Sequence, residues 1–428
     1  MVENLKGLKA LSPLIIFIIL YLVTSLIAQD FYKIPIIIAF LISSIYALIF
    51  MPKALKTNKR VEIFCNGAGK NNIMFMLLIF ILAGAFANSA KDMGCIDATV
   101  NLALIVLPPN MLLAGIFLAS CFVSMAIGTS VGSIVALIPI AGGIAETTGI
   151  SLNLVSAIVV GGSFFGDNLS FISDTTVVST NMLGCKMNDK FKVNSFIVMP
   201  AAIIALIIYF FIGIQAHYQT QVGEIEYIKV IPYITVLIAA VCGINVLLVL
   251  IIGIILTGTI GIWFNCYDIY GCLKSMNDGI IGMSELIIVT MLAGGLLEIV
   301  KYNGGIDFII QKLTNRIHSK KGAELSIGVL VSLVNICTAN NTVAILTVGG
   351  VAKNICNKYN IDNRKAASIL DTFSCCIQGI IPYGAQILIA ASLTKLNPIN
   401  IVPYLYYPML IGLSTFIAII LRYPKRYS

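Results

Sequence analysis

The stretch GGSFFGDNLSFISDTT, residues 161–176, concentrates polar groups inside a chain that is otherwise almost entirely apolar. It holds two carboxylates (Asp167 and Asp174), one carboxamide (Asn168), five hydroxyls and three glycines. Ionisable groups at membrane depth are costly unless they face a cavity or a partner. Glycine and polar runs also break helices, which a membrane tolerates only where the broken backbone lines a cavity or is buried in protein. The stretch therefore predicts a site that handles an ion.

The composition around this stretch predicts an integral membrane protein. Of the 428 residues, 59% are hydrophobic and 11% are charged, and the mean hydropathy is +0.98. A soluble domain carries about 25% charged residues. The apolar runs are long and continuous, whereas a membrane β-barrel shows short alternating strands. We expect an all-α polytopic fold with about ten to twelve transmembrane segments, some of them short or interrupted.

The formal net charge of +8 comes from basic residues in short loops, for example at 53–60, 186–192 and 312–321. Basic loops normally stay cytoplasmic. We therefore expect a multi-pass protein of the cell inner (cytoplasmic) membrane with a cytoplasmic N-terminus. The first apolar run, 11–28, lacks a clear small-residue cleavage site, and a second run follows at 34–51. This pattern favours a retained helix over a signal peptide.

An internal repeat relates the two halves of the chain. LAGAFANSAKDMGCID at Leu82–Asp97 matches LAGGLLEIVKYNGGID at Leu292–Asp307 at an offset of 210, including the spaced Lys, Gly and Asp. We predict a first transmembrane repeat at 1–215, an inter-repeat linker at 216–229 and a second repeat at 230–428. The repeats are expected to be inverted if each holds an odd number of crossings.

The polar stretch has a counterpart in the second half. Ser163–Asp167 faces Ser374–Gln378 within DTFSCCIQGIIPYGAQ, residues 371–386. A polar break lies about 35 residues upstream of each, at 128–133 and at 338–342. Paired, interrupted apolar segments at corresponding places in two repeats point to the site of a secondary transporter. We expect two broken or re-entrant helical hairpins that meet near the membrane midplane.

The donors in these segments suit Na⁺, a hard cation that prefers oxygen ligands. A carboxylate in an apolar site is relieved by a proton or by a cation, but not easily by both, so competition for one site is a sufficient basis for exchange. Helix capping is the alternative role for Asp167 and Asp174. Asp371 is the only acid between Ala366 and Ser392. The candidate ion ligands are Asp167, Asn168, Ser170, Ser173, Asp174, Thr175, Asn340, Asn341, Thr342, Asp371 and Gln378.

Enzyme signatures are weak. No Walker loop occurs, which favours an ion gradient as the energy source. One G-x-S-x-G string, Gly128–Gly132, lies in an apolar segment rather than at a strand-to-helix turn with a histidine partner. The eleven cysteines are scattered without a C-x-x-C pattern, so we expect neither a disulfide framework nor a metal centre. We expect no enzyme activity and no cofactor beyond the transported ions.

Four strings resemble the NhaC-type sodium/proton antiporters of bacteria: GDNLSFISDTT (166–176), GCKMNDKFKVN (184–194), TANNTVAI (338–345) and LDTFSCCIQGIIPYGAQ (370–386). The resemblance implies membership of the ion-transporter superfamily, with inverted repeats, paired re-entrant hairpins and often a dimeric scaffold. It implies Na⁺ and H⁺ as transported ions and the lipid bilayer as surroundings, and a homodimer is compatible with it. Because the basic residues sit in short loops, we expect no nucleic-acid partner. It also implies that the ion path is lined by Asp167, Asn168, Ser170, Asp174, Thr175, Asn340, Asn341 and Asp371.

Other functions stay open at this point. Relatives in the same family resemble malate/lactate exchangers and amino-acid permeases, so a Na⁺- or H⁺-coupled carrier of a small carboxylate or amino acid is the main alternative. An organic carboxylate would need a cationic partner or helix N-termini. The cluster segments contain no convincing Arg or Lys, which favours a cation alone. A channel, or a scaffold or receptor that transports nothing, is a more distant alternative.

Overall fold

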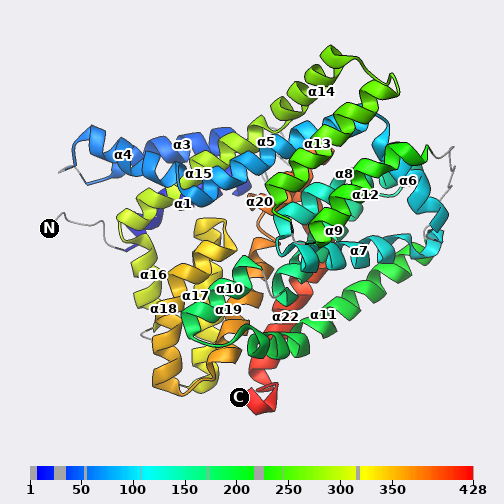
Figure 1. Cartoon of the computed structure of the whole chain (residues 1–428). Helices are drawn as coiled ribbons and strands as arrows, with labels where there is room; N and C mark the ends of the chain where they lie inside the picture. The colour runs from blue at the N-terminus through cyan, green and yellow to red at the C-terminus, as the bar shows by residue number, and fades with distance from the viewer. Residues whose placement is uncertain are drawn as a thin grey trace.

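The computed structural model describes residues 7–23, 35–52, 55–106, 108–170, 173–215, 226–242, 244–314 and 319–427. Within these ranges the chain is helical and has no strand, as the long apolar runs predict (Figure 1). Most of the expected linker, 216–225, lies outside the described residues. The boundaries predicted for the two repeats and the linker therefore stay predictions.

Ten α-helices, counting all those described before the gap at 216–225, make up the first half. They are α1 (Leu8–Ile18, continued by the π-helical turn η1, Ile19–Val23), α3 (Ile36–Phe50), α4 (Thr57–Ala68), α5 (Asn71–Asp92), α6 (Cys95–Val106), α7 (Leu112–Ile127, after the 3₁₀ turn η2, Pro109–Met111), α8 (Ser130–Thr148), α9 (Leu152–Leu169), α10 (Asp174–Leu183) and α11 (Met187–Gln215), with α1 and η1 forming one continuous rod.

The second half holds eleven α-helices within its described residues, α12 to α22. Its helices are α12 (Tyr227–Val241), α13 (Val246–Trp263), α14 (Ile269–Gly282), α15 (Ser284–Tyr302), α16 (Gly305–Thr314), α17 (Lys320–Thr338), α18 (Asn341–Tyr359), α19 (Asn363–Gln378), α20 (Ala385–Thr394), α21 (Pro398–Ile401, followed by the 3₁₀ turn η3, Val402–Tyr404) and α22 (Tyr406–Ile420), with a last 3₁₀ turn η4 (Lys425–Tyr427).

Seven helical segments of the described chain are long and apolar enough to cross a membrane. They are Ile73–Asp92, Ser130–Thr148, Leu152–Leu183 (α9 and α10 with the break between them), Met187–Ile214, Val246–Trp263, Ile269–Tyr302 (α14 and α15) and Lys320–Thr338. The bent pair Pro398–Tyr404 and Tyr406–Ile420, which meet at 53°, would make an eighth. Shorter apolar helices, such as Ile36–Phe50 and Leu112–Ile127, accompany them. The multi-pass architecture is thus confirmed, with the short and interrupted segments that the sequence predicts.

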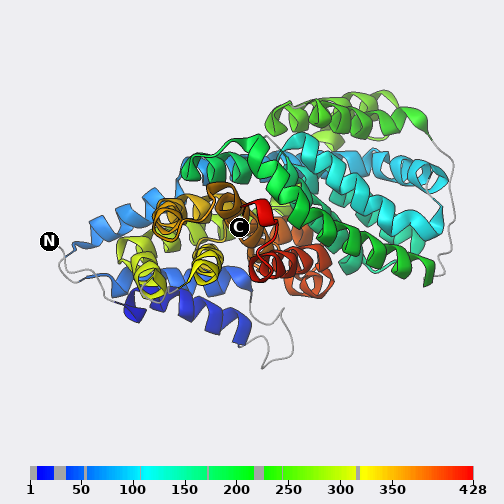
Figure 2. The ribbon, with the colours of Figure 1, turned by 90° about the horizontal axis from the view of Figure 1, so that it is seen from below.

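Two helical hairpins, the first formed by α7 and α8 and the second by α17 and α18, lie on opposite sides of the molecule. α7 and α8 pack on α9, whereas α17 and α18 pack on α19. Figure 2 shows α22 between these two groups, seen from below. After each of the breaks that follow α9 and α19, the next helix packs against the opposite group. α10 packs against α18 and α19, and α20 packs against α8 and α9. The tips of both hairpins and both breaks therefore meet at the centre.

The first hairpin approaches α9 closely because α9 carries small residues on that face. Gly162 lies against Ser120 and the backbone of α7, and Gly166 lies against Ser124, so that a Cβ at either position would overlap α7. Small residues spaced four apart let two helix backbones come close in a membrane. This approach fixes the C-terminal turn of α9, which carries Asp167, against the hairpin tip.

Two pairs of helices, with one member of each pair in each half, begin at a constant offset in the sequence. α8 and α18 both have 19 residues and begin 211 positions apart, at 130 and 341. α10 and α20 both have 10 residues and begin at 174 and 385, the same offset of 211. Ser124 donates its hydroxyl to the carbonyl of Ser163 at 2.5 Å, and Asn335 donates its amide to the carbonyl of Ser374 at 2.7 Å. Each donor and each acceptor in this pair of contacts is again 211 positions from its counterpart.

Candidate ion-binding site

Each hairpin turns through a two-residue break of the same backbone shape. Helix α7 is followed by Gly128 in the left-handed region (φ 73°), and Thr129 is extended (φ −147°) before α8 begins. Helix α17 is followed by Ala339, also in the left-handed region (φ 47°), and Asn340 is extended (φ −149°) before α18 begins. Such breaks point the free N–H groups of the next helix, and the positive end of its dipole, at the space beyond the tip. Two helix N-termini therefore face the centre.

The carboxylate of Asp167 lies on one of these N-termini. The backbone N–H of Ser130, the first residue of α8, donates to Asp167 Oδ1 at 2.9 Å. The Asp167 side chain is 5% exposed. A carboxylate at a helix N-terminus is stabilised by the dipole and by the free N–H groups. Asp167 thus accepts from the N-terminus of α8 while it is itself part of α9.

The break after α9 exposes carbonyl groups that side chains of the following turn satisfy. The last carbonyls of a helix have no partner within the helix. Ser173 Oγ and Thr175 Oγ1 donate to the carbonyl of Asp167 at 2.6 and 3.1 Å. Ser173 also caps α10, because its Oγ accepts from the N–H of Thr176. The sequence left helix capping open as a role for Asp174, but the residue that caps α10 is Ser173.

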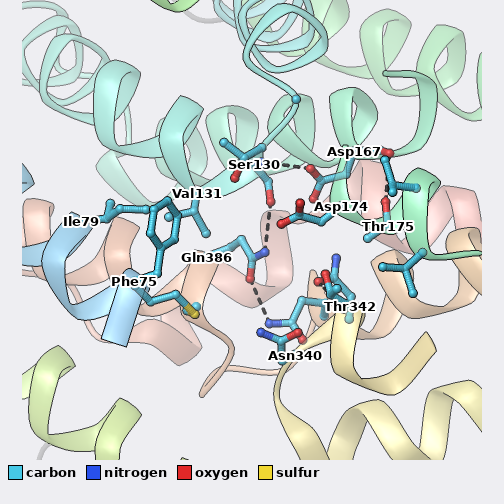
Figure 3. Close-up of a pocket in the computed structure, with 18 of the residues that line it drawn as sticks. Phe75, Ile79, Ser130, Val131, Asp167, Asp174, Thr175, Asn340, Thr342 and Gln386 are labelled. Carbon is cyan, nitrogen blue, oxygen red and sulfur yellow. Dashed lines mark hydrogen bonds between the residues drawn. The ribbon is translucent and has the colours of Figure 1, made fainter. Parts of the chain in front are cut away.

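A cavity of about 320 Å³ lies between the hairpin tips and the two breaks. Figure 3 shows Asp167 and Asp174 on one side of it, with Asn340, Thr342 and Gln386 on the other. Its polar lining consists of Thr129, Ser130, Asp167, Asp174, Thr175, Asn340, Asn341, Thr342, Gln378 and Gln386. The sequence had predicted seven of these ten as ion ligands. Thr129, Ser130 and Gln386 are additions from the structure.

A chain of amide contacts joins the tip of one hairpin to the tip of the other. Gln378 Nε2 donates to the carbonyl of Ala339 and to Gln386 Oε1, both at 2.9 Å. Gln386 Nε2 donates in turn to Ser130 Oγ at 3.0 Å. Gln378 is buried, and its Oε1 has no hydrogen-bond partner among the described residues. A buried acceptor without a partner is costly, so this oxygen is suited to a cation in the cavity.

Asn340 and Asn341 shape the second hairpin tip. Asn340 Oδ1 caps α18 by accepting from the N–H of Val343 at 3.0 Å. Asn341 Oδ1 accepts from the N–H of Thr342 at 3.0 Å, and its Nδ2 contacts Cys375 Sγ at 3.7 Å. Both side chains line the cavity, and both accept hydrogen bonds from backbone N–H groups in the first turn of α18.

Four predicted residues lie outside the cavity lining: Asn168, Ser170, Ser173 and Asp371. Ser170 donates to the carbonyl of Met125 at 2.8 Å, which ties the break to the first hairpin. Asn168 and Asp371 are buried on the far side of the break, where Asn168 Nδ2 donates to Asp371 Oδ2 at 3.2 Å. Their surroundings form a second polar cluster.

This second cluster is centred on Lys190 of α11, whose Nζ lies 2.7 Å from Asp371 Oδ2. Both side chains are completely buried. Asn194, one turn further along α11, donates to the same carboxylate oxygen at 2.8 Å and to the carbonyl of Asn168 at 2.8 Å. Tyr407 of α22 donates its hydroxyl to Asn168 Oδ1 at 2.9 Å. The structure thus gives Asp371 a lysine partner.

Sequence reasoning had placed Lys190 in a basic loop with Lys186 and Lys192. Two signals pointed elsewhere. A single acid in a long apolar run requires a cationic partner, and Lys190 and Asn194 are spaced to share one face of a helix. Because 181 residues separate Lys190 from Asp371, a local sequence pattern does not predict that they form a pair.

Among the described residues, no three His, Cys, Asp or Glu side chains gather as they would at a metal centre. A cation in this cavity would therefore depend on one or two carboxylates together with amide, hydroxyl and backbone oxygens. This donor set fits a hard monovalent ion that is bound and released.

Comparison with known proteins decides the family. The model of the Na⁺/H⁺ antiporter family matches residues 9–214 and 216–424. The chain belongs to the Na⁺/H⁺ antiporter family. The residues that line the cavity lie within the matched ranges, and so does the buried Lys190–Asp371 pair.

Curated proteins that this chain resembles match it over most of their length. The Na⁺/H⁺ antiporter NhaC of Bacillus subtilis is 25% identical over 399 residues, which is 84% of this chain and 85% of that protein. The malate-2H⁺/Na⁺-lactate antiporter of the same organism is 21% identical over 377 residues, 79% of each chain. Among solved structures, the YdaH transporter of Alcanivorax borkumensis matches with a TM-score of 0.42 and 13% identity, covering 85% of this chain and 88% of that one.

Proposed function

We propose that this protein is a secondary active transporter that exchanges Na⁺ for H⁺ across the bacterial cytoplasmic membrane, and that the exchange takes place at the cavity between the hairpin tips. One observation carries the proposal. Two carboxylates, Asp167 and Asp174, share this cavity with a buried amide oxygen of Gln378 that has no hydrogen-bond partner among the described residues. Family membership supports the choice of ions.

Competition at Asp167 would couple the two ions. Its carboxylate is buried, so an empty, charged site is unfavourable in surroundings of low dielectric constant. A proton relieves the charge, and so does Na⁺, but one oxygen pair does not hold both. Asp174 lies in the first turn of α10 on the exposed side of the same cavity. In this proposal it forms the entrance and shares the bound cation.

Neutral oxygens would complete the coordination. Gln378 lines the cavity together with the carboxylates, and Thr175, Asn340, Asn341 and Thr342 line the same space. Hard cations accept such amide and hydroxyl oxygens as readily as carboxylates. Asn168, Ser170 and Ser173 would act one step away, by holding the break between α9 and α10.

The halves of the chain would act as two transmembrane repeats, 1–215 and 230–428, around this shared site. The offset of 211 between their helix boundaries supports that division. Alternating access would come from rocking of one group of helices against the other, as in other transporters built from repeats. The family resemblance is also compatible with a homodimer, which a mass measurement in detergent would test. No enzymatic step is part of this proposal.

A coupled carrier of a small carboxylate or amino acid is the second candidate. Two observations favour it. The cavity volume of about 320 Å³ exceeds the needs of a bare ion, and helix N-termini at Ser130 and Asn341 face it, where an organic carboxylate is stabilised. Lys190, however, is buried against Asp371 and is not among the residues that line the cavity.

Proton flux in proteoliposomes with a preset pH gradient separates the two candidates. Na⁺ is added first, then K⁺, then a panel of carboxylates and amino acids. We expect Na⁺ alone to collapse the gradient, D167N to abolish the response, and D307N, which changes an exposed carboxylate on α16, to leave it intact. If Na⁺ acts only when an organic solute is present, the protein is a metabolite carrier and the cavity is its coupling site.

A further inference from the structure

The contacts of Lys190 join both sides of the central break to the opposite half of the molecule. Its Nζ donates to Thr176 Oγ1 at 2.6 Å and approaches the carbonyl of Asn168 at 3.4 Å. Asn168 lies before the break between α9 and α10, and Thr176 lies after it. Asp371, the third partner, belongs to α19. One ammonium group therefore connects α9, α10 and α19 from its place on α11.

This arrangement also fixes the charge of the centre. Three carboxylates lie near the break: Asp167 and Asp174 in the cavity lining, and Asp371 behind it. The buried ammonium group neutralises Asp371, and the amides of Asn194 and Asn168 donate to the same oxygen. This carboxylate therefore already has a cationic partner at 2.7 Å. Only the two cavity carboxylates are then left to exchange ions.

The buried cluster is also linked to the cavity. Cys375 Sγ lies 3.8 Å from Asp371 Oδ1 and 3.7 Å from Asn341 Nδ2, and Asn341 lines the cavity. A movement of the Asp371 side chain would therefore change contacts both at the tip of the second hairpin and at the break beside Asp167.

From these contacts we infer that Lys190 is a positioning residue of the ion site, which holds the α9–α10 break in shape and keeps Asp371 out of the exchange by a permanent ion pair. This inference rests on the proposed function and deepens it, because it limits the exchanging acids to Asp167 and Asp174. It gives Asp371 a different role from the ion ligand that its position in the sequence suggested.

The test uses two single variants and their combination in the full-length protein. K190Q leaves Asp371 as an unpaired buried charge, which is strongly unfavourable, whereas replacing both partners of a buried pair is often tolerated. In K190Q/D371N the amide groups retain hydrogen-bonding capacity without either charge. We expect K190Q to lose exchange or to raise the Na⁺ concentration for half-maximal exchange at least tenfold. The double variant should recover to within about threefold of wild type and keep the wild-type pH profile.

A second buried ion pair provides the matched control. Lys365 Nζ lies 3.0 Å from Glu324 Oε2, and both side chains are buried, between the start of α17 and the start of α19. K365Q should lower the thermal unfolding midpoint without changing the Na⁺ concentration for half-maximal exchange in the folded fraction. A similar change in half-saturation for K365Q and K190Q would overturn the assignment, because both effects would then be general consequences of a broken buried pair.

Thermal unfolding in detergent separates this inference from the function on which it rests. The midpoint should fall for K190Q and for D371N, and the double variant should be more stable than the sum of the two losses predicts. That coupling would appear even if the wild-type protein exchanged no Na⁺. If the double variant stays inactive while it is folded and wild type is active, Asp371 is itself an ion ligand and the inference is wrong.

Discussion

The backbone N–H of Ser130 donates to the carboxylate of Asp167 at 2.9 Å, so the first turn of α8 and the last turn of α9 meet at the candidate site. The two residues lie 37 positions apart and come from different helices. Asp167 therefore has two separable roles. It satisfies a buried N–H group, and it offers a charge to an ion.

Substitutions at Asp167 should separate these roles. D167N keeps an oxygen that accepts from Ser130, so we expect its unfolding free energy to stay within about 1 kcal/mol of wild type while exchange is lost. D167L removes the acceptor as well and should cost a further 1–3 kcal/mol, on the order of one unsatisfied buried donor. Thermal or denaturant unfolding in detergent, together with flux in proteoliposomes, checks both. Equal stability of the two variants would mean that the Ser130 contact contributes nothing.

Gly166 should not accept a side chain. A Cβ at this position would overlap Ser124 of α7, and overpacking typically costs about 1–3 kcal/mol. We expect G166A to lower the unfolding midpoint and to reduce exchange, since Asp167 is the next residue. G350A is the matched control, because a Cβ there meets nothing within 4 Å and α18 is helical. If G350A destabilises as much as G166A, close packing of α7 on α9 is not the cause.

Gln378 occupies the position in the second half that corresponds to Asp167, at an offset of 211, and it also lines the cavity. We expect Q378L, which removes the amide oxygen, to raise the Na⁺ concentration for half-maximal exchange about tenfold, a loss near 1.4 kcal/mol. Q378E adds a carboxylate and should lower that concentration at alkaline pH. If both variants behave like wild type, the oxygen of Gln378 does not coordinate the ion.

Competition between proton and Na⁺ predicts the direction of the pH dependence. At low pH the proton occupies the exchanging carboxylate, so more Na⁺ is needed to displace it. Where that carboxylate is mostly protonated, the Na⁺ concentration for half-maximal exchange should rise about tenfold for each unit that the pH falls, as expected for one linked proton. Flux measured over a grid of pH and Na⁺ checks this. A half-saturation that does not change with pH would show that the two ions bind independently.

Much of the fold could be predicted from the sequence because its signals are local. Long apolar runs predict membrane helices, and the polar breaks at 128–133 and 338–342 predict the two hairpin tips. The cavity residues Asp167, Asp174 and Asn340 stood out because polar groups in apolar segments are costly and therefore informative.

The rest of the site depends on contacts between distant parts of the chain. Ser130 faces Asp167 only because glycines let α9 approach α7, and Lys190 is buried only because α11 carries it beneath the break. Lysines occur in loops as a rule, so the short-range pattern around Lys190 favoured an exposed position. Ser170 and Ser173 were predicted as ion ligands from their place beside Asp167. The structure adds that their hydroxyls donate to the carbonyls of Met125 and Asp167, and these contacts depend on how the chain folds around the break.

The most direct test of the central claim is proton release on Na⁺ binding to the purified protein in weakly buffered detergent solution. The account predicts that added Na⁺ acidifies the solution for wild type, that K190Q/D371N behaves similarly, and that D167N/D174N releases no protons. Proton release that persists in D167N/D174N would contradict the account, because the proton and Na⁺ would then exchange at a site other than the cavity between the hairpin tips.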